Sequence, residues 1–259
     1  MVMEETFNEK QGHWMLAKLG KQVLRPGGIE LTKVLIEAMN IVATDDVVEL
    51  APGLGLTANI ACSKNPNSYT GVDRNAEAAA LAKEHIHFDK AKIVIGDAAN
   101  TRLPDSYASK VYGEAMLTMH PIETKRGIIH EAARILKPGG YYGIHELCVQ
   151  PEDISEIDKK KIFKDLGSNM RVHAHPLTIP EWKQLLDSEG FEVKKVATSP
   201  MALLEFKRLL QDEGLGRTLK IMFKVMLHSE VRKRVLHIRA MFRRHAKDIE
   251  AVAIIAQKK

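Results

Sequence analysis

The run of twelve residues from Val47 to Ala58 has the composition of a tight turn between a strand and a helix. It reads VVELAPGLGLTA: branched aliphatic residues, one acid, a proline and two glycines, then helix formers. This order predicts a strand, a glycine turn and a helix start. Gly53, Gly55 and Ala58 satisfy a loose G-x-G-x-x-A spacing, which lets the backbone approach a bound nucleotide closely. The stretch therefore predicts a nucleotide site.

The residues around the glycine turn indicate which nucleotide the predicted site binds. No Lys-Ser or Lys-Thr pair follows the glycines, which disfavours ATP. A dinucleotide fits the spacing, because Asp73 ends the next predicted strand and could take the ribose hydroxyls. Glu49, however, lies four positions before Gly53 and could receive an ammonium group, which the methionine part of S-adenosylmethionine carries and NAD does not. Asp97, after the third predicted strand, could meet the amino group of an adenine.

Strands and helices alternate around these residues. The pattern predicts strands at DVVEL (46–50), SYTGVD (68–73), KIVIGD (92–97), KVYGEAML (110–117) and YYGIHEL (141–147), and then at 191–199 and 248–259. The first five units predict a parallel sheet with helices on both faces. Residues 148–179 and 201–247 interrupt the alternation, and we expect them to form helical insertions on the substrate side.

Four motifs in this order resemble those of the class I S-adenosylmethionine-dependent methyltransferases that act on small molecules. They are ELAPGLG, GVDRN, GDAANTRLP and LKPGG, and the resemblance covers about residues 47–146. The chain departs from the family where Pro52 follows Ala51, because the family commonly has a glycine there. The resemblance implies an α/β, Rossmann-like sheet of seven strands, with the last strand antiparallel and inserted between the fifth and sixth.

The resemblance also implies a cofactor site at the carboxyl ends of the strands, for S-adenosylmethionine and its product S-adenosylhomocysteine. It places Asp73 on the ribose, and Asp97 with the backbone of Ala98 at the adenine. An N-terminal helical cover, residues 1–42, could add Arg25 against the cofactor's carboxylate. The predicted cofactor residues are Arg25, Gly28, Glu49, Ala51, Gly53, Gly55, Thr57, Asp73, Arg74, Asp97, Ala98, Met116 and Met119.

Candidate acceptor-side residues follow the fourth and fifth strands. His120 is the candidate general base, since an unperturbed histidine titrates near pH 6.5; the alternative is a packed residue before Pro121. The predicted substrate contacts are Trp14, His145, Glu146, Arg171, His173 and His175. The two histidines of the insertion could also join His120 or Glu146 around a metal, but their spacing is not diagnostic and we predict no metal.

The composition of the chain limits which binding partners and which cellular compartment we expect. The chain has 259 residues and a net charge of +5, and residues 229–245 form a predicted amphipathic basic helix. That helix could be a lid with solvated charges, a membrane-surface contact or a nucleic-acid contact. An aromatic content of 5% argues against nucleic acid. No apolar run is long enough to span a bilayer, and the polar N-terminus is unlike a secretory signal, so we predict a cytoplasmic protein. The length of 259 residues suits a single domain, 1–259. The oligomeric state has no signature in the sequence.

The predicted function is methyl transfer from S-adenosylmethionine to a small-molecule acceptor. An NAD(P)-dependent oxidoreductase that uses the same glycine turn is the alternative, and a non-catalytic binding protein is a third class. Glu49 and Asp97 favour the methyltransferase over the oxidoreductase, because neither residue has a role in binding a dinucleotide.

Overall fold

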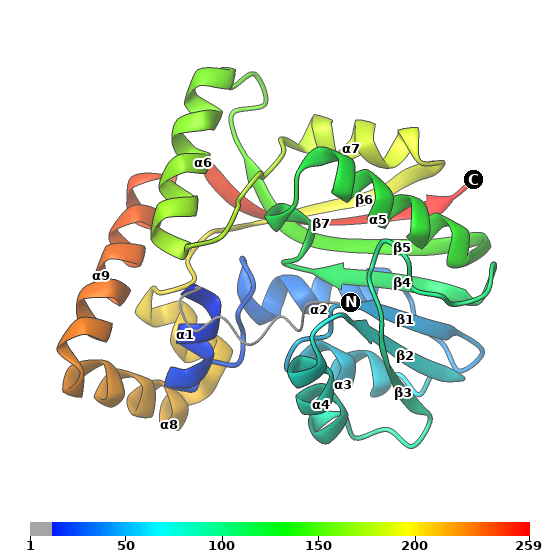
Figure 1. Ribbon diagram of the computed structural model, residues 1–259, viewed down its shortest axis with the longest axis horizontal. Coiled ribbons are helices and arrows are strands. Elements are labelled where there is room, and N and C mark those ends of the chain that lie inside the picture. Colours follow the sequence, from blue (N-terminus) through cyan, green and yellow to red (C-terminus); the bar gives the residue numbers. More distant parts are fainter. Residues whose placement is uncertain (1–11) are drawn as a thin grey trace.

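The computed structural model describes residues 12–259 and contains one sheet of seven strands (Figure 1). The strand order is β3-β2-β1-β4-β5-β7-β6. The strands are β1 (Asp46–Leu50), β2 (Ser68–Asp73), β3 (Ala91–Ile95), β4 (Ala108–Glu114), β5 (Leu136–Val149), β6 (Phe191–Pro200) and β7 (Ile249–Lys258). β7 pairs antiparallel with β5 and β6, whereas the other pairings are parallel. The predicted fold class is confirmed.

Helices cover both faces of this sheet (Figure 1). α5 (Ile122–Ile135) and α7 (Ile179–Ser188) lie on one face, and α2 (Gly28–Ala38), α3 (Leu56–Cys62) and α4 (Ala76–His85) lie on the other. Each layer encloses its own apolar cluster, one with Ile128, Ile129 and Trp182, the other with Leu35 and Ala58. A sheet covered on both faces needs strands that are nearly continuous in apolar residues, and the central run Val47–Leu50 is buried, with Glu49 as its one acid.

The remaining described helices gather at one end of the sheet, and we call them the helical cap (Figure 1). They are α1 (Gly12–Leu19), α6 (Glu156–Met170), α8 (Phe206–Leu227) and α9 (Ser229–Arg244), which share a third apolar cluster. A short 3-10 turn, η1 (Leu117–Met119), follows β4 on the same side. The cap comes from the N-terminal segment and the two insertions, which the sequence indicated but did not place against one another.

Several element boundaries differ from the sequence-based expectation. β3 ends at Ile95, two residues before the predicted end of that strand, and β5 (Leu136–Val149) is longer than the strand predicted at 141–147. In the predicted N-terminal cover, α1 ends at Leu19, and residues 1–11 lie outside the described part of the chain. Gly214 has a non-helical backbone inside α8 (φ 71°, ψ 169°) and divides it into two helical segments. Within residues 12–259, no helix combines the length and the apolar character needed to cross a bilayer.

Candidate active site

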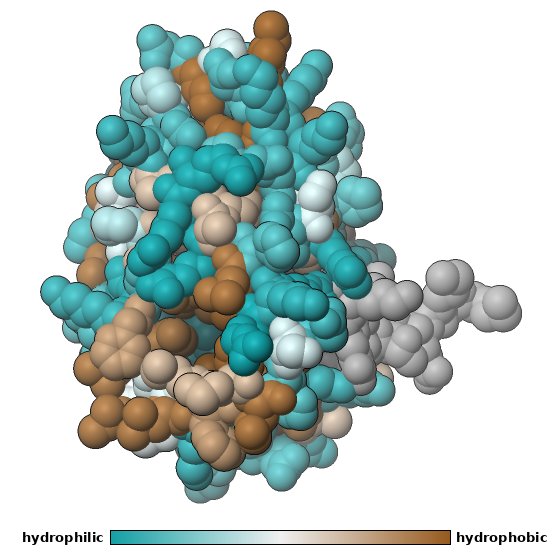
Figure 2. Space-filling model, turned by 90° about the vertical axis from the view of Figure 1, so that its left-hand side faces the viewer, coloured by the Kyte–Doolittle hydropathy of each residue, from teal (hydrophilic) through white to brown (hydrophobic). Residues whose placement is uncertain are grey.

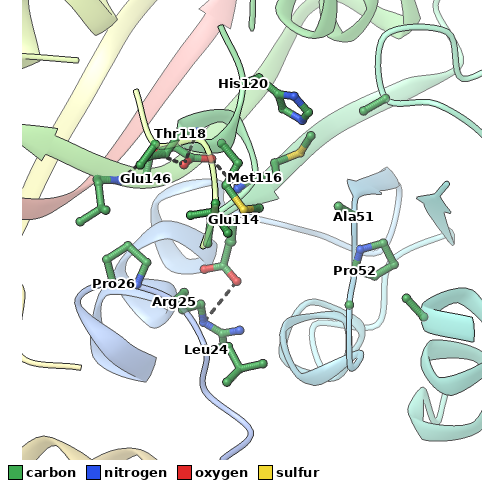
Figure 3. A pocket seen from close by; sticks show the side chains of 18 of the residues that line it. Leu24, Arg25, Pro26, Ala51, Pro52, Glu114, Met116, Thr118, His120 and Glu146 are labelled. Atoms are coloured by element: carbon green, nitrogen blue, oxygen red, sulfur yellow. Dashed lines mark hydrogen bonds and ion pairs between the residues drawn. The ribbon is translucent and has the colours of Figure 1, made fainter. Parts of the chain in front are cut away.

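A cavity of about 940 Å³ lies where the parallel strands end and the cap begins. Its wall includes the residue after each of the first four strands: Ala51, Arg74, Gly96 and Ala115. Figure 3 shows Glu114, Met116 and Glu146 on one side of it and Ala51 and Pro52 on the other. The cavity is thus at the edge where open α/β sheets bind ligands.

Most of the predicted site residues line this cavity. From the cofactor set, these are Arg25, Glu49, Ala51, Gly53, Thr57, Asp73, Arg74, Asp97, Ala98, Met116 and Met119, and from the acceptor set His120, Glu146, Arg171, His173 and His175. Gly28, Gly55 and His145 do not line it. The side chain of Trp14 lies outside the described part of the structure.

The two glycines of the turn have different roles: Gly53 lines the cavity, and Gly55 allows neighbouring helices to pack closely. Gly53 has a left-handed backbone (φ 55°), and a Cβ added there would meet no atom of residues 12–259 within 4 Å, so toward the described residues its backbone faces free space. Gly55 is also left-handed (φ 74°), but its added Cβ would lie 2.9 Å from Ile86 of the turn after α4. This corrects the prediction for Gly55, which permits packing between α3 and α4. Ala51 also adopts a positive φ of 58°, an uncommon conformation for a residue with a side chain.

Two acids lie at the ends of neighbouring strands: Asp73 is the last residue of β2, and Asp97 lies two residues after β3. Asp73 is buried, and its Oδ1 accepts the backbone N–H of Asn75 at 2.9 Å. Burial raises the pKa of the Asp73 carboxyl. Asp97 is exposed and accepts the backbone N–H of Ala99 at 2.7 Å. Each carboxylate is oriented by its own turn, and each lines the cavity, so a sugar and a base could lie across the two strand ends.

Glu49 is a buried carboxyl with an unusual pair of partners. The hydroxyls of Tyr69 and Tyr112 both donate to its Oε2, at 2.5 and 2.7 Å. Burial raises the pKa of Glu49 to about 7, although these two hydrogen bonds oppose the shift. A bound cation would favour the ionised form, so the site suits the ammonium group that the sequence analysis assigned to it.

Glu114, at the end of β4, is a site residue that the sequence analysis missed. Its carboxylate accepts hydrogen bonds from Thr57, from Thr32 at 2.6 Å and from the His145 ring at 2.7 Å. Burial alone would raise the pKa of Glu114, but the Arg25 charge and the His145 hydrogen bond outweigh it and lower the pKa to about 2. The acid is therefore a fixed negative charge. No motif marked it, because its partners come from distant parts of the chain.

Arg25 reaches this carboxylate from the segment before α2. Its Nε lies 3.4 Å from Glu114 Oε2, and Figure 3 shows the guanidinium pointing toward that acid. Among the described residues, the buried Nε and Nη2 find no hydrogen-bond acceptor, although Nε is ion-paired with Glu114. Buried donors that lack an acceptor are costly, and they suit a bound carboxylate such as the one predicted to lie against this residue. Gly28 is corrected: its added Cβ would lie 2.4 Å from Asp212 of α8, so it serves the packing of α2 on the cap.

Glu146 and His145, both predicted as substrate contacts at the end of β5, make different contacts in the structure. Glu146 accepts the backbone N–H groups of Met116, Leu117 and Thr118 and the Thr118 hydroxyl, at 2.7 to 3.0 Å. It thereby shapes the η1 turn that forms the cavity wall. His145 is buried away from the cavity, because its ring bridges Glu114 and the carbonyl of Pro26, which lies 2.6 Å from Nε2. This corrects the prediction that His145 contacts the substrate: it positions Glu114 and the Arg25 segment.

His175 of the first insertion is held against the residues after β4. The Lys125 ammonium donates to the carbonyls of His120 and His175, at 2.5 and 2.8 Å. The His175 N–H donates to the carbonyl of Thr118 at 2.8 Å. Burial, together with the Lys125 charge, lowers the pKa of His175, which favours a neutral ring at neutral pH. Among the described residues, no three His, Cys, Asp or Glu side chains lie close enough to hold a metal ion.

Comparison with known proteins decides the family. A family model described as "Methyltransferase domain" matches residues 48–144, the segment that carries the glycine turn and both strand-end acids. The chain belongs to the class I S-adenosylmethionine-dependent methyltransferases. An uncharacterized protein of Haemophilus influenzae is 32% identical over 254 residues, which cover 96% of this methyltransferase and 99% of that protein.

A named relative and a solved structure of the same fold are also methyltransferases. A sterol 24-C-methyltransferase of Gibberella zeae is 27% identical over 153 residues, or 57% of this chain and 39% of that protein. A solved geranyl diphosphate methyltransferase in complex with S-adenosylmethionine has a TM-score of 0.65 at 12% identity, and the match covers 88% of this chain and 84% of that one. The methyltransferase prediction is confirmed, and nothing in these comparisons supports the oxidoreductase alternative.

The cavity of the methyltransferase fits S-adenosylmethionine, its cofactor. The Arg25 donors that make no hydrogen bond to described residues would take the carboxylate, Glu49 the ammonium, Asp73 the ribose hydroxyls and Asp97 the adenine amine. In the described part of the chain, the backbone at Gly53 has free space for a close approach. Each assignment pairs a group on the ligand with a complementary group that already lines the cavity.

Proposed function

We propose that this methyltransferase acts on a small acceptor with an apolar body and one polar group. The observation that carries the proposal is the wall of the cavity opposite the strand ends. It is contributed by the helical cap and the segment between β6 and α8, and it is mainly apolar, with Leu166, Met170, Met201, Leu203 and Phe242. The cavity is also at the upper end of the roughly 300–1,000 Å³ typical of small-ligand sites, which leaves room beside the cofactor.

The polar side of the acceptor space is formed by His120, His173 and His175. When bound, S-adenosylmethionine supplies a methyl group activated by its sulfonium. The protein has to orient the acceptor in line with that methyl and exclude water, and positioning of this kind can supply roughly 7–11 kcal/mol of the barrier. His120 takes the proton if the accepting atom carries one at the working pH.

The sterol and geranyl diphosphate methyltransferases named above support an apolar acceptor by analogy only. The two cysteines, Cys62 and Cys148, are both unpaired, which supports a place in a reducing compartment such as the cytoplasm.

A labelling experiment tests the proposal. Purified enzyme is incubated with S-adenosylmethionine carrying a radioactive methyl group and with the lipid-soluble or the water-soluble fraction of a cell extract. We expect labelled product from the lipid-soluble fraction, with lower turnover but unchanged binding of S-adenosylhomocysteine in His120→Gln. Label confined to the water-soluble fraction, to protein or to nucleic acid would reject the proposed acceptor class.

A further inference from the structure

The cap carries an apolar surface that the fold does not use. In the second half of α8, six apolar side chains are each 42% to 64% exposed: Leu215, Leu219, Met222, Phe223, Met226 and Leu227. Figure 2 shows apolar side chains gathered at this lower end of the cap face. We call these residues the α8 apolar face, and we infer that it docks on the surface of an anionic lipid bilayer.

The spacing of these residues separates the docking surface from the packing surface. Positions 215, 219, 222 and 226 follow the i, i+4, i+7, i+11 rule and form one stripe along the helix, with 223 and 227 beside it. A different stripe, Thr218, Ile221 and Val225, faces the fold: the first two are buried, and Val225 packs against the apolar cluster of the cap. The α8 apolar face is therefore an addition to the packing face of the helix, and stability of the fold does not explain it.

Basic residues border the α8 apolar face. At 100° per residue, Arg217, Lys220 and Lys224 fall on the third side of α8, next to Phe223 and Leu227, and all three are exposed. Arg232 and Lys233 continue this charge into α9. An exposed apolar stripe bordered by long basic side chains is the arrangement of helices that lie in a membrane interface, where lysines and arginines reach lipid phosphates.

The charge distribution favours an anionic partner. Residues 215–236 contain six basic side chains and one acidic side chain, which leaves 32 of each sign in the rest of the chain. The whole net charge of +5 therefore equals that of this one segment. A second copy of the chain is a poor occupant, because a two-fold contact here would bring two such segments together. Anionic lipid satisfies both the apolar and the basic part of the surface.

The surface is also continuous with the cap that encloses the active site. Phe242 of α9 lines the main cavity, while Met222, Met226 and Leu236 line a smaller apolar groove of about 290 Å³ between α1, α8 and α9. Docking through α8 would thus hold the acceptor end of the enzyme near the bilayer. The inference concerns the surface alone and does not depend on the acceptor class proposed above.

Vesicle sedimentation with the full-length chain tests the inference. The probes are vesicles of phosphatidylcholine alone and of phosphatidylcholine mixed with phosphatidylserine. We expect binding to the mixed vesicles only, reduced by added salt. Phe223→Ser with Met226→Ser, and separately Lys220→Glu with Lys224→Glu, should each weaken this binding by at least about tenfold.

Matched variants on α6 control for the loss of an exposed apolar or basic residue. Ile157→Ser removes a side chain that is 69% exposed, and Lys160→Glu reverses an exposed charge, so both should bind vesicles like the wild type. All variants should keep wild-type affinity for S-adenosylhomocysteine, which reports folding. The inference is overturned if the wild type ignores anionic vesicles, binds neutral ones equally, or loses binding as much in the α6 variants as in the α8 variants. A dimer in solution that the α8 serine variant abolishes would assign the face to a second copy.

Discussion

At the scale of single residues, the site consists of buried carboxyl groups whose pKa values depend on the charges and hydrogen bonds around them. Glu114 is ionised because Arg25, His145 and two threonine hydroxyls stabilise its charge, whereas burial is the largest effect on Glu49 and raises the pKa of that carboxyl to about 7. Two carboxyls in one cavity thus differ in pKa because of their neighbours. Both carboxyls line the cavity: Glu114 is a fixed negative charge, and Glu49 is the carboxyl that a bound ammonium group would ionise.

The role of Asp73 predicts a binding defect. Replacing Asp73 by alanine removes the carboxylate that would accept the ribose hydroxyls, so the affinity for S-adenosylhomocysteine should fall by at least about tenfold, or roughly 1.4 kcal/mol. Titration calorimetry measures it. Asp89→Ala is the control, since Asp89 is exposed and does not line the cavity. Equal affinities for the two variants would remove Asp73 from the site.

The pKa of Glu49 predicts a pH dependence of cofactor binding. With a pKa of about 7, the carboxyl is mostly neutral below that pH and mostly ionised above it, and only the ionised form attracts an ammonium group. Affinity for S-adenosylhomocysteine should therefore rise about tenfold between about pH 6 and about pH 8, with proton release on binding. Glu49→Gln should lose this slope while any titration of the ligand itself remains. A slope that is the same in both proteins counts against the assignment.

At the scale of elements, the cavity wall is built by contacts between segments that are far apart in sequence. Glu146 of β5 holds the η1 turn through three backbone N–H groups, and Lys125 of α5 ties His120 to the insertion that carries His175. His120 and His175 are therefore positioned through their backbone carbonyls.

Removing the Lys125 ammonium should loosen that insertion. In Lys125→Met, two carbonyls lose their donor, so amide hydrogen exchange should become faster across residues 172–178 and stay the same in β6 and β7. Mass spectrometry of the exchanged protein measures this. Lys83→Met, an exposed lysine of α4, controls for the change of charge. Unchanged exchange at 172–178 would show that the His175–Thr118 hydrogen bond holds the segment by itself.

At the scale of the whole molecule, the cluster around Glu114 joins β4, β5, α2 and α3. In the folded protein the pKa of Glu114 is about 2, below the ordinary value of 4.5. Ionised Glu114 therefore stabilises the fold above pH 4.5, and this stabilisation is lost as the pH falls toward 2. The loss should be on the order of 3 kcal/mol in the free energy of unfolding.

Urea unfolding at a series of pH values measures that loss. Glu114→Gln should be less stable than the wild type near neutral pH, and its stability should change less across the acid range. Glu84→Gln, on the exposed side of α4, should keep the wild-type profile. If Glu114→Gln keeps it too, Glu114 is not the group that titrates.

The sequence by itself determined the sheet, the glycine turn and the two strand-end acids. These depend on local order along the chain: a buried strand is apolar throughout, a tight turn needs glycine, and the residue after a parallel strand falls at one edge of the sheet. Only the tertiary structure decided that Glu114 meets Arg25, that His145 is buried behind it, that Gly28 and Gly55 serve packing, and that the α8 apolar face remains exposed. Those facts depend on which side chains meet across long sequence separations, and a local pattern contains no information about that.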